Sequence, residues 1–178
     1  MKGSVKKDFV MPIVVLGVIC LVITGLLAVT NNFTEPVITK ASEERAQAAR
    51  SQIIPAAQDF ELIELEGIPD TIKEIYSADN NNGYIFMITT TGYGGDMDLI
   101  CGIDNDGKII DVDTLKHNET KGMGSRTTEE PFRSQFRGKD SSLEGVDAIT
   151  GATISSTAYI NAIRDAFTAY DILRKEIG

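Results

Sequence analysis

The strongest feature of the hydrophobic pattern is an uncharged apolar run from Phe9 to Val29, which reads FVMPIVVLGVICLVITGLLAV. A helix rises about 1.5 Å per residue, so about twenty such residues can cross the hydrocarbon core of a bilayer. A cleaved signal peptide would have an apolar core of about 7–15 residues and a small-residue cleavage site, which Ala28-Val29-Thr30 resembles poorly. A lipoprotein site at Cys20 is also disfavoured, because bulky Ile19 precedes that cysteine. We therefore expect an uncleaved transmembrane helix over residues 9–30.

The charges that flank this helix predict its orientation. Lys2, Lys6 and Lys7 precede it and only Asp8 opposes them. The positive-inside bias then keeps residues 1–8 in the cytoplasm. Residues 31–178, after the helix, would lie on the outer side of the cell (inner) membrane.

Beyond the membrane, residues 31–55 have a composition typical of an exposed helix. The stretch from Thr34 to Ile54 is rich in alanine, glutamate, arginine and glutamine, and Pro55 follows it. Because the residue before a proline disfavours the helical conformation, we expect this helix to end there. A juxtamembrane stalk and a partner-binding helix are both open, and residues 56–178 form the extracytoplasmic domain.

The pattern then changes to short strands of β-branched, aromatic or alternating residues. In the third of them, Met97, Leu99, Cys101 and Ile103 fall on one face. The four predicted strands are Lys73–Ser77, Tyr84–Thr90, Asp96–Ile103 and Lys108–Leu115.

Asn105-Asp106-Gly107 supplies a tight turn between the last two predicted strands, and Asp-Gly is a strong hairpin signal. The acidic residues around it lack the spacing and the terminal glutamate of a calcium loop, so we interpret them as the hairpin surface. They are Asp104, Asp106, Asp111 and Asp113.

Two helices are expected in the outer domain, a short one over Glu130–Phe136 and a long amphipathic one over Ser156–Lys175. The apolar residues of the long helix recur at spacings of three and four, which predicts a face packed on the core. They are Tyr159, Ala162, Ile163, Ala166, Phe167 and Tyr170, whereas Arg164, Asp165 and Asp171 lie off this stripe. The fold class is therefore α+β: a single N-terminal transmembrane helix, then a small antiparallel sheet packed with helices.

Charge and cysteine content narrow the classes of partner. Three of the 17 basic residues and one of the 26 acidic residues precede residue 31, so residues 31–178 carry 14 basic and 25 acidic residues, a net −11. This balance argues against nucleic acid or an anionic lipid surface as a partner of the outer domain. Cys20 lies in the apolar run and Cys101 in the outer domain, so no disulfide or cysteine metal site is expected.

The segment that indicates chemistry is Asp147-Ala148-Ile149-Thr150-Gly151-Ala152-Thr153, just before the long helix. Free backbone N–H groups and the positive end of a helix dipole favour an anion at such a place. Gly151 and Ala152 would let the backbone approach a bulky phosphate ester. Ordinary N-capping by threonine and serine is the competing interpretation.

DAITGATIS resembles the Asp-x-x-(Ser/Thr)-Gly-Ala-(Thr/Ser) signal at which flavin transferases attach FMN through its phosphate. Upstream, the chain resembles the FMN-binding domain of the RnfG and NqrC subunits of bacterial ion-translocating electron-transport complexes. The segments that carry this likeness are Gly92-Tyr93-Gly94-Gly95, Asp106-Gly107 and His117-Asn118-Glu119-Thr120-Lys121-Gly122-Met123-Gly124. Lys121 departs from the family, which usually has proline there.

The resemblance implies a cofactor and a set of residues that hold it. FMN would be bound covalently, as a phosphoester on Thr153, and the loop after His117 would pack against the flavin ring. Without the family, this loop would be interpreted as a plain glycine-containing turn. The cofactor-binding residues implied are Thr153, Asp147, Thr150, Gly151, Ala152, Glu119, Thr120, Gly122, Met123 and Gly124.

Other polar residues near these motifs receive weaker roles. His117, the only histidine, is interpreted as structural, while Arg126 is a candidate partner of the FMN phosphate or of the acidic surroundings. A threonine hydroxyl is a poor nucleophile and no adjacent base is evident, so a separate flavin transferase should modify Thr153.

The function implied is an electron relay within a membrane complex of the Rnf type, a ferredoxin:NAD oxidoreductase coupled to ion transport. The chain has no dinucleotide-binding glycine fingerprint and no cysteine set for an iron–sulfur cluster, so it would not be a complete enzyme by itself. An NqrC-type role in a sodium-translocating quinone reductase, a stand-alone flavin reductase and a non-redox extracytoplasmic binding module remain alternatives.

Overall fold

The computed structural model describes residues 4–177. The chain divides into two units, Met1–Glu44 and Arg45–Gly178, and each is described by itself. Lys2, one of the charges behind the orientation prediction, lies outside the described residues.

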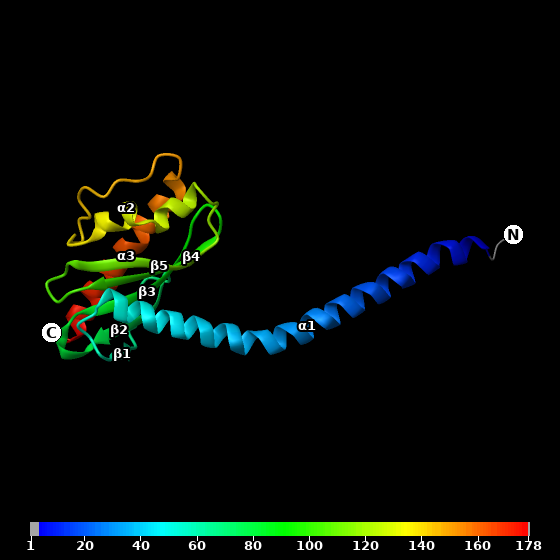
Figure 1. Cartoon of the computed structure of the whole chain (residues 1–178), viewed down its shortest axis with the longest axis horizontal. Helices are drawn as coiled ribbons and strands as arrows, with labels where there is room; N and C mark the ends of the chain where they lie inside the picture. The colour runs from blue at the N-terminus through cyan, green and yellow to red at the C-terminus, as the bar shows by residue number, and fades with distance from the viewer. Residues whose placement is uncertain (1–3, 178) are drawn as a thin grey trace. The chain divides into compact units, whose positions relative to one another are not determined.

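A single long helix, α1 (Ser4–Ile53), includes both the predicted transmembrane segment and the predicted stalk (Figure 1). Within it, Val10–Glu35 is long and apolar enough to cross a membrane, with a mean hydropathy of 2.9 in its most apolar window. No part of that window is buried against the rest of the chain. Near its end, the hydroxyls of Thr30 and Thr34 donate to carbonyls one turn earlier, at 2.9 and 2.8 Å, so these polar groups are satisfied within the helix.

The second unit is built on one five-stranded antiparallel sheet in which each strand pairs with its neighbour in the sequence. The four predicted strands are confirmed with small shifts at their ends. One further strand, β1, was not predicted, because its four residues form a short, half-exposed edge strand with no clear alternation. The strands are β1 (Phe60–Ile63), β2 (Ile72–Ala78), β3 (Tyr84–Thr91), β4 (Asp96–Ile103) and β5 (Ile109–His117).

The predicted hairpin turn joins β4 to β5. Gly107 has φ +75°, which a glycine adopts without strain, and its N–H donates to the carbonyl of Asp104 at 3.1 Å. The Asp104 carboxylate accepts hydrogen bonds from the backbone N–H groups of Asp106 and Lys108, both at 2.9 Å. One carboxylate of the acidic cluster is thus used to form the turn.

The helices after the sheet begin and end close to the predicted positions (Figure 1). Over the predicted Glu130–Phe136 helix, a single α-helical turn is followed by a 3₁₀ turn, and the long C-terminal helix begins three residues earlier than predicted, at Thr153. After the sheet these elements are η2 (Gly124–Thr128), α2 (Glu130–Arg133), η3 (Ser134–Phe136) and α3 (Thr153–Ile177), whereas η1 (Asp79–Asn81) lies between β2 and β3.

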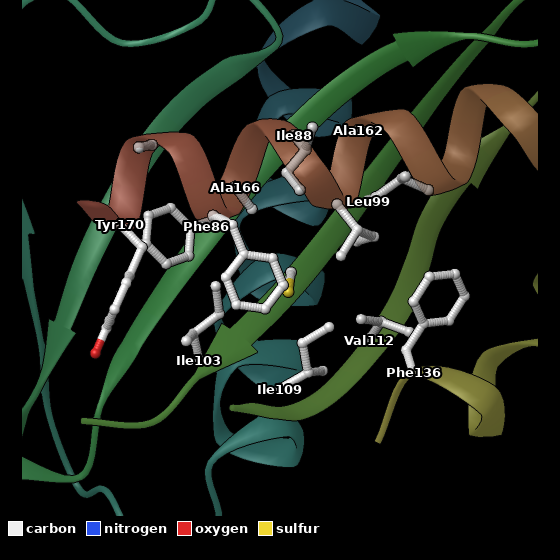
Figure 2. Close-up of a cluster of buried hydrophobic side chains, with 14 of the residues drawn as sticks. Phe86, Ile88, Leu99, Ile103, Ile109, Val112, Phe136, Ala162, Ala166 and Tyr170 are labelled. Atoms are coloured by element: carbon white, nitrogen blue, oxygen red, sulfur yellow. The ribbon is translucent and has the colours of Figure 1, made fainter. Parts of the chain in front are cut away.

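Helix α3 covers one face of the sheet with the apolar stripe that the sequence predicts (Figure 2). All six residues of the stripe are buried, and so are Met97, Leu99, Cys101 and Ile103 on the facing strand. Phe132, Phe136 and Tyr159 pack as an aromatic group with ring centroids 5.4 Å apart. Burial of so much apolar surface is the main stabilising contribution of this unit.

The opposite face of the sheet is covered by the last turns of α1, from Arg45 onward. Ala49, Ile53 and Ile54 pack with Ile85 and Ile100 in a smaller apolar cluster. The end of α1 therefore belongs to the folded unit rather than to a freely exposed stalk.

Ion pairs fasten α2 and η3 to β5. Arg137 donates to both carboxylate oxygens of Asp111, at 2.9 and 3.0 Å, while Arg133 pairs with Asp113. Glu130 accepts from both arginines. The hydrogen bonds from Arg137 to Asp111 and Glu130 raise the pKa of its guanidinium.

Candidate functional site

The loop from Asp147 to Ala152 is held rigidly at both ends. The N–H of Asp147 donates to Oε1 of Gln135 at 2.9 Å. The hydroxyl of Ser156 accepts from the N–H of Ile149 at 3.0 Å and donates to the carbonyl of Ala152 at 2.8 Å. Gly151 turns the chain with φ +84°, a conformation in which other L-residues are strained.

Thr153 is the first residue of α3 and its side chain is exposed. The carbonyl of Ala152 accepts the first helical hydrogen bond, from the N–H of Ser156 at 2.9 Å, so alanine occupies the N-cap position. Alanine has no oxygen with which to cap the free N–H groups of the first turn. The positive end of a 25-residue helix is thus left open beside the Thr153 hydroxyl.

A cleft of ≈ 480 Å³, called here the Thr153 cleft, opens at this helix end. Its walls come from the turn after β3, the loop after β5 and the start of α3, three segments far apart in the sequence. The residues that line it are Tyr93, Glu119, Thr120, Met123, Gly124, Gly151, Ala152, Thr153, Ile154 and Ser155. A cleft of this size is in the range of those that bind small molecules and cofactors.

The predicted site residues divide into three groups. Thr153, Gly151 and Ala152 from the first motif, and Glu119, Thr120, Met123 and Gly124 from the second, line the Thr153 cleft together. Gly122 lies in the same loop but does not line it. Asp147 and Thr150 line a different cleft.

Glu119 is the buried charged residue of the Thr153 cleft, with 7% of its surface exposed. Its Oε1 accepts from the N–H of Gly94 at 3.2 Å, whereas its Oε2 is buried without a hydrogen-bond partner in the described part of the chain. A buried acceptor without a partner is costly, so an orphaned oxygen at a cleft indicates a missing donor.

Glycines make room for this carboxylate. A Cβ added to Gly124 would lie 1.9 Å from Oε2 of Glu119, and one added to Gly92 would lie 2.0 Å from its Oε1. At Gly94 the added Cβ would lie 2.3 Å from the carbonyl oxygen of Asn118. The Gly92–Gly95 turn and the loop after His117 are therefore fitted to each other through Glu119.

His117 takes part in the same structure from outside the cleft. Its Nδ1 accepts a hydrogen bond from the N–H of Glu119 at 3.2 Å, which helps to set the direction of the glutamate. This contact supports the structural interpretation of the histidine.

The rim of the Thr153 cleft is apolar. Tyr93, Met123 and Ile154 are 72%, 55% and 59% exposed, and among the described residues from Arg45 onward the only other exposed large apolar side chain is Leu62. Such a concentration around one opening indicates a ligand with a large apolar surface. A flavin ring satisfies this requirement, and the phosphate of FMN suits the open end of α3.

A second cleft of ≈ 370 Å³, called here the Asp147 cleft, is lined by the preceding residues of the same loop, Asp147–Thr150. The same cleft is also lined by Arg126 in the middle of η2, Glu129 just after η2 and Gln135 of η3. Arg126, a predicted phosphate partner, is therefore placed with Asp147 and not among the residues that line the Thr153 cleft.

Three residues of the Thr153 cleft were not predicted as site residues: Tyr93, Ile154 and Ser155. Tyr93 stands inside the glycine-rich turn and the other two directly follow Thr153, so adjacency to the motifs was a usable signal. Their convergence depends on a tertiary contact, since the N–H of Tyr93 donates to the hydroxyl of Ser155 at 3.4 Å.

Comparisons with known proteins identify a cofactor-binding domain family in the part of the chain that forms the Thr153 cleft. Residues 92–168 match the FMN-binding domain family, and residues 14–53 match the RnfG N-terminal region. The G subunit of the ion-translocating oxidoreductase complex of Methanosarcina acetivorans is 33% identical, over 92% of this chain and 95% of that protein. The G subunit of the Na⁺-translocating ferredoxin:NAD⁺ oxidoreductase complex of Acetobacterium woodii is 29% identical, over 90% of this chain and 92% of that protein.

Among solved structures, the C subunit of the Na⁺-translocating NADH-quinone reductase of Parabacteroides distasonis is similar, with a TM-score of 0.49 and 20% identity. The match covers 64% of this chain and 76% of that one. The full-length likeness to the M. acetivorans protein, together with the two family matches, shows that this chain belongs to the RnfG family, the G subunits of ion-translocating oxidoreductase complexes.

Proposed function

We propose that the chain is a membrane-anchored electron relay that carries FMN covalently, as a phosphoester on Thr153. The observation that carries this proposal is the position of Thr153. Its exposed side chain stands at the uncapped end of α3, on the wall of a cleft with an apolar rim and an orphaned buried acceptor.

Each part of the Thr153 cleft suits one part of FMN. The free N–H groups at the start of α3 would hold the phosphate, and Gly151 would allow its close approach. Tyr93 and Met123 would contact the ring, while Oε2 of Glu119 would accept a hydrogen bond from one of the N–H or O–H groups of FMN. Bound FMN supplies one- and two-electron transfer, and the chain supplies orientation and burial.

Attachment requires a second protein. The Thr153 hydroxyl has no hydrogen bond to a base among the described residues, and a threonine hydroxyl is weakly nucleophilic at neutral pH. A flavin transferase would therefore provide the base that takes the hydroxyl proton. The donor would be a flavin dinucleotide: the Thr153 oxygen would form a bond to the phosphorus next to the flavin, and the anhydride bond from that phosphorus to the nucleoside monophosphate leaving group would break, with no change in oxidation state.

The membrane anchor would be the apolar part of α1. Its large apolar side chains from Val10 to Val29 are exposed, which is unfavourable in water and favourable in lipid. We propose a cytoplasmic N-terminus over residues 1–8, a transmembrane segment over 9–30, a juxtamembrane segment over 31–55 and an extracytoplasmic FMN-binding domain over 56–178, on whose sheet the juxtamembrane residues from Arg45 onward pack. A covalent tether would prevent loss of the flavin on that side of the membrane.

The relatives indicate the surroundings of this relay. They are named as subunits of ion-translocating complexes, two of them of ferredoxin:NAD⁺ oxidoreductases. We propose that this chain likewise passes electrons between other membrane subunits of an Rnf-type complex. The match of residues 14–53 to the RnfG N-terminal region favours this assignment over an NqrC-type role.

The test is coexpression of the full chain with an active flavin transferase, followed by in-gel fluorescence of the denatured protein. Wild type and Thr153→Ser, which keeps the hydroxyl, are expected to fluoresce, whereas Thr153→Val is expected to be dark. Thr157→Val, a change at the next exposed threonine of α3, serves as the matched control and should fluoresce. Fluorescence of Thr153→Val, or a dark wild type beside a labelled control carrier, would contradict covalent attachment here.

A further inference from the structure

Lys121 is an exposed cation in the loop that forms one wall of the Thr153 cleft. Thr120 before it and Met123 after it both line this cleft. The ion pairs between described residues are made by Arg133 and Arg137, and none of them involves Lys121. Within the described part of the chain, no carboxylate therefore neutralises this charge by direct contact.

The backbone holds Lys121 at the corner of a tight turn. The N–H of Met123 donates to the carbonyl of Thr120 at 3.2 Å. Gly122 has φ +79°, whereas Lys121 has no positive φ. These are the features of a type II β-turn, in which Lys121 occupies the position that favours proline. The turn itself does not require a lysine, so the side chain adds a charge that the local fold does not need.

The turn limits how far the ammonium of Lys121 can lie from the cleft. Adjacent Cα atoms are about 3.8 Å apart and an extended lysine side chain is about 6 Å long, so the ammonium lies within about 10 Å of the Cα atom of Thr120 in every rotamer. At about 10 Å, the Coulomb interaction of two unit charges changes an equilibrium constant about twofold in water, and by more beside a protein surface.

The charges around the cleft otherwise oppose the reduction of a cofactor bound there. Glu119 is the charged residue among those that line the cleft, and it is buried. Residues 31–178 as a whole carry a net charge of −11. Reduction of a flavin adds negative charge, which these carboxylates disfavour and a nearby cation favours.

We propose that Lys121 sets the midpoint potential of FMN in the Thr153 cleft through its charge, favouring the reduced form and offsetting part of the effect of Glu119. The interaction acts through space, so the ammonium does not have to touch the ring. This inference rests on the proposed attachment of FMN to Thr153.

The test is a redox titration of the FMN-loaded, detergent-solubilised full chain, followed by absorption at about 0.01 M salt. Lys121→Gln removes the charge and is expected to lower the equilibrium constant for reduction about threefold, a fall of about 14 mV for a two-electron couple. Lys121→Glu reverses the charge and should lower it about tenfold, or about 30 mV. Lys121→Arg keeps the charge and should keep the wild-type potential.

Lys108 provides the matched control. It is an exposed lysine just before β5, and the nine residues of that strand, about 30 Å long, separate it from the loop that carries Lys121. Lys108→Gln and Lys108→Glu change the net charge by the same amounts and should keep the wild-type potential. Raising the salt to about 1 M shortens the Debye length to about 3 Å, so the difference between Lys121→Glu and wild type should disappear.

The outcomes separate the charge from other effects of the loop. A wild-type potential in both Lys121→Gln and Lys121→Glu at low salt would overturn the proposal, and so would equal shifts in the Lys108 variants. A fall in Lys121→Arg as large as that in Lys121→Gln, or a shift that persists at high salt, would assign the effect to the shape of the loop and also overturn it. Failure of the wild-type chain to accept FMN would instead contradict the proposed attachment.

Discussion

Helix α3 takes part in two regions whose chemistry differs sharply. Along its middle, the stripe from Tyr159 to Tyr170 is closed against the sheet by apolar side chains. At its first residue, Thr153, six positions before Tyr159, the helix end is uncapped and borders an open cleft with an orphaned carboxylate oxygen. Apolar side chains of the chain itself fill the core, although the hydroxyl of Tyr159 there has no partner among the described residues. The cleft instead combines an uncapped helix end, an exposed threonine and a partnerless carboxylate oxygen at an opening, as expected of a site that binds a ligand.

The largest effect expected from this comparison is a loss of stability when a core residue is truncated, with little loss when a residue of the cleft rim is truncated. Phe86→Ala removes a fully buried ring and should destabilise the fold by about 3–5 kcal/mol. Met123→Ala on the cleft rim should change stability by only about 0.5 kcal/mol or less. Urea unfolding of the detergent-solubilised chains measures both. Equal destabilisation would show that the cleft is as much a part of the core as Phe86.

The next effect concerns the fit between Glu119 and its glycines. Gly124→Ala places a Cβ where Oε2 of Glu119 lies, so the carboxylate must leave its hydrogen bond to Gly94. A loss of about 1–3 kcal/mol is expected, as for other overpacking changes.

A double-mutant cycle tests this fit. In a Glu119→Ala background, Gly124→Ala should cost clearly less, because the clash has been removed. Additive effects of the two changes would show that Glu119 and Gly124 are not coupled.

A smaller effect is expected on the flavin itself. Glu119→Gln replaces a carboxylate oxygen by an amide that can donate a hydrogen bond, and donors beside the ring stabilise its electron-rich reduced form. We expect the midpoint potential of the FMN-loaded chain to rise by about 30 mV, equivalent to about 1.4 kcal/mol for a two-electron couple. Redox titration followed by absorption measures it. An unchanged potential would place Glu119 away from the ring.

The smallest effect lies in the core at alkaline pH. Burial raises the pKa of Tyr159 by more than the nearby Thr114 hydroxyl lowers it. Burial also raises the pKa of Cys101. Both groups are neutral in the fold but ionise in the unfolded chain, so stability is complete below their ordinary values of 9.0 and 10.0 and falls as the pH rises above them.

Tyr159→Phe removes one of these two groups without removing the ring. At neutral pH its stability should lie within about 1 kcal/mol of wild type. Above pH 10.0, the ordinary tyrosine pKa, its free energy of unfolding should fall less steeply than that of wild type. Chemical unfolding at a series of pH values checks this, and identical slopes would contradict a buried, neutral Tyr159.

The parts of the fold that depend on local pattern could be predicted from the sequence. Apolar residues recur at the helical period along α3 and alternate with the strand period along β4. The Asp-Gly pair by itself predicts the tight turn between β4 and β5. β1 escaped prediction because Phe60–Ile63 is short and its place depends on pairing with β2. The start of α3 was placed too late because serine and threonine suggested a cap, whereas Ala152 occupies that position.

The site could be predicted only as far as its motifs extend. Thr153 and the loop from Glu119 to Gly124 were identified together through a family resemblance. Their meeting in one cleft depends on the contacts of Gly94 with Glu119 and of Tyr93 with Ser155, between residues 25 and 62 positions apart. The separation of Asp147 from Thr153 into two clefts has no counterpart in the sequence, because both belong to one continuous motif.

The most direct test of the central claim is the intact mass of the chain, purified from membranes of its native host and measured after denaturation. Covalent attachment predicts a gain of one FMN less one water, and peptide sequencing by mass spectrometry should locate it on Thr153. An unmodified mass in cells whose flavin transferase labels another carrier would contradict a covalent flavin relay. An FMN attached to a different residue would show that Thr153 is not the attachment site.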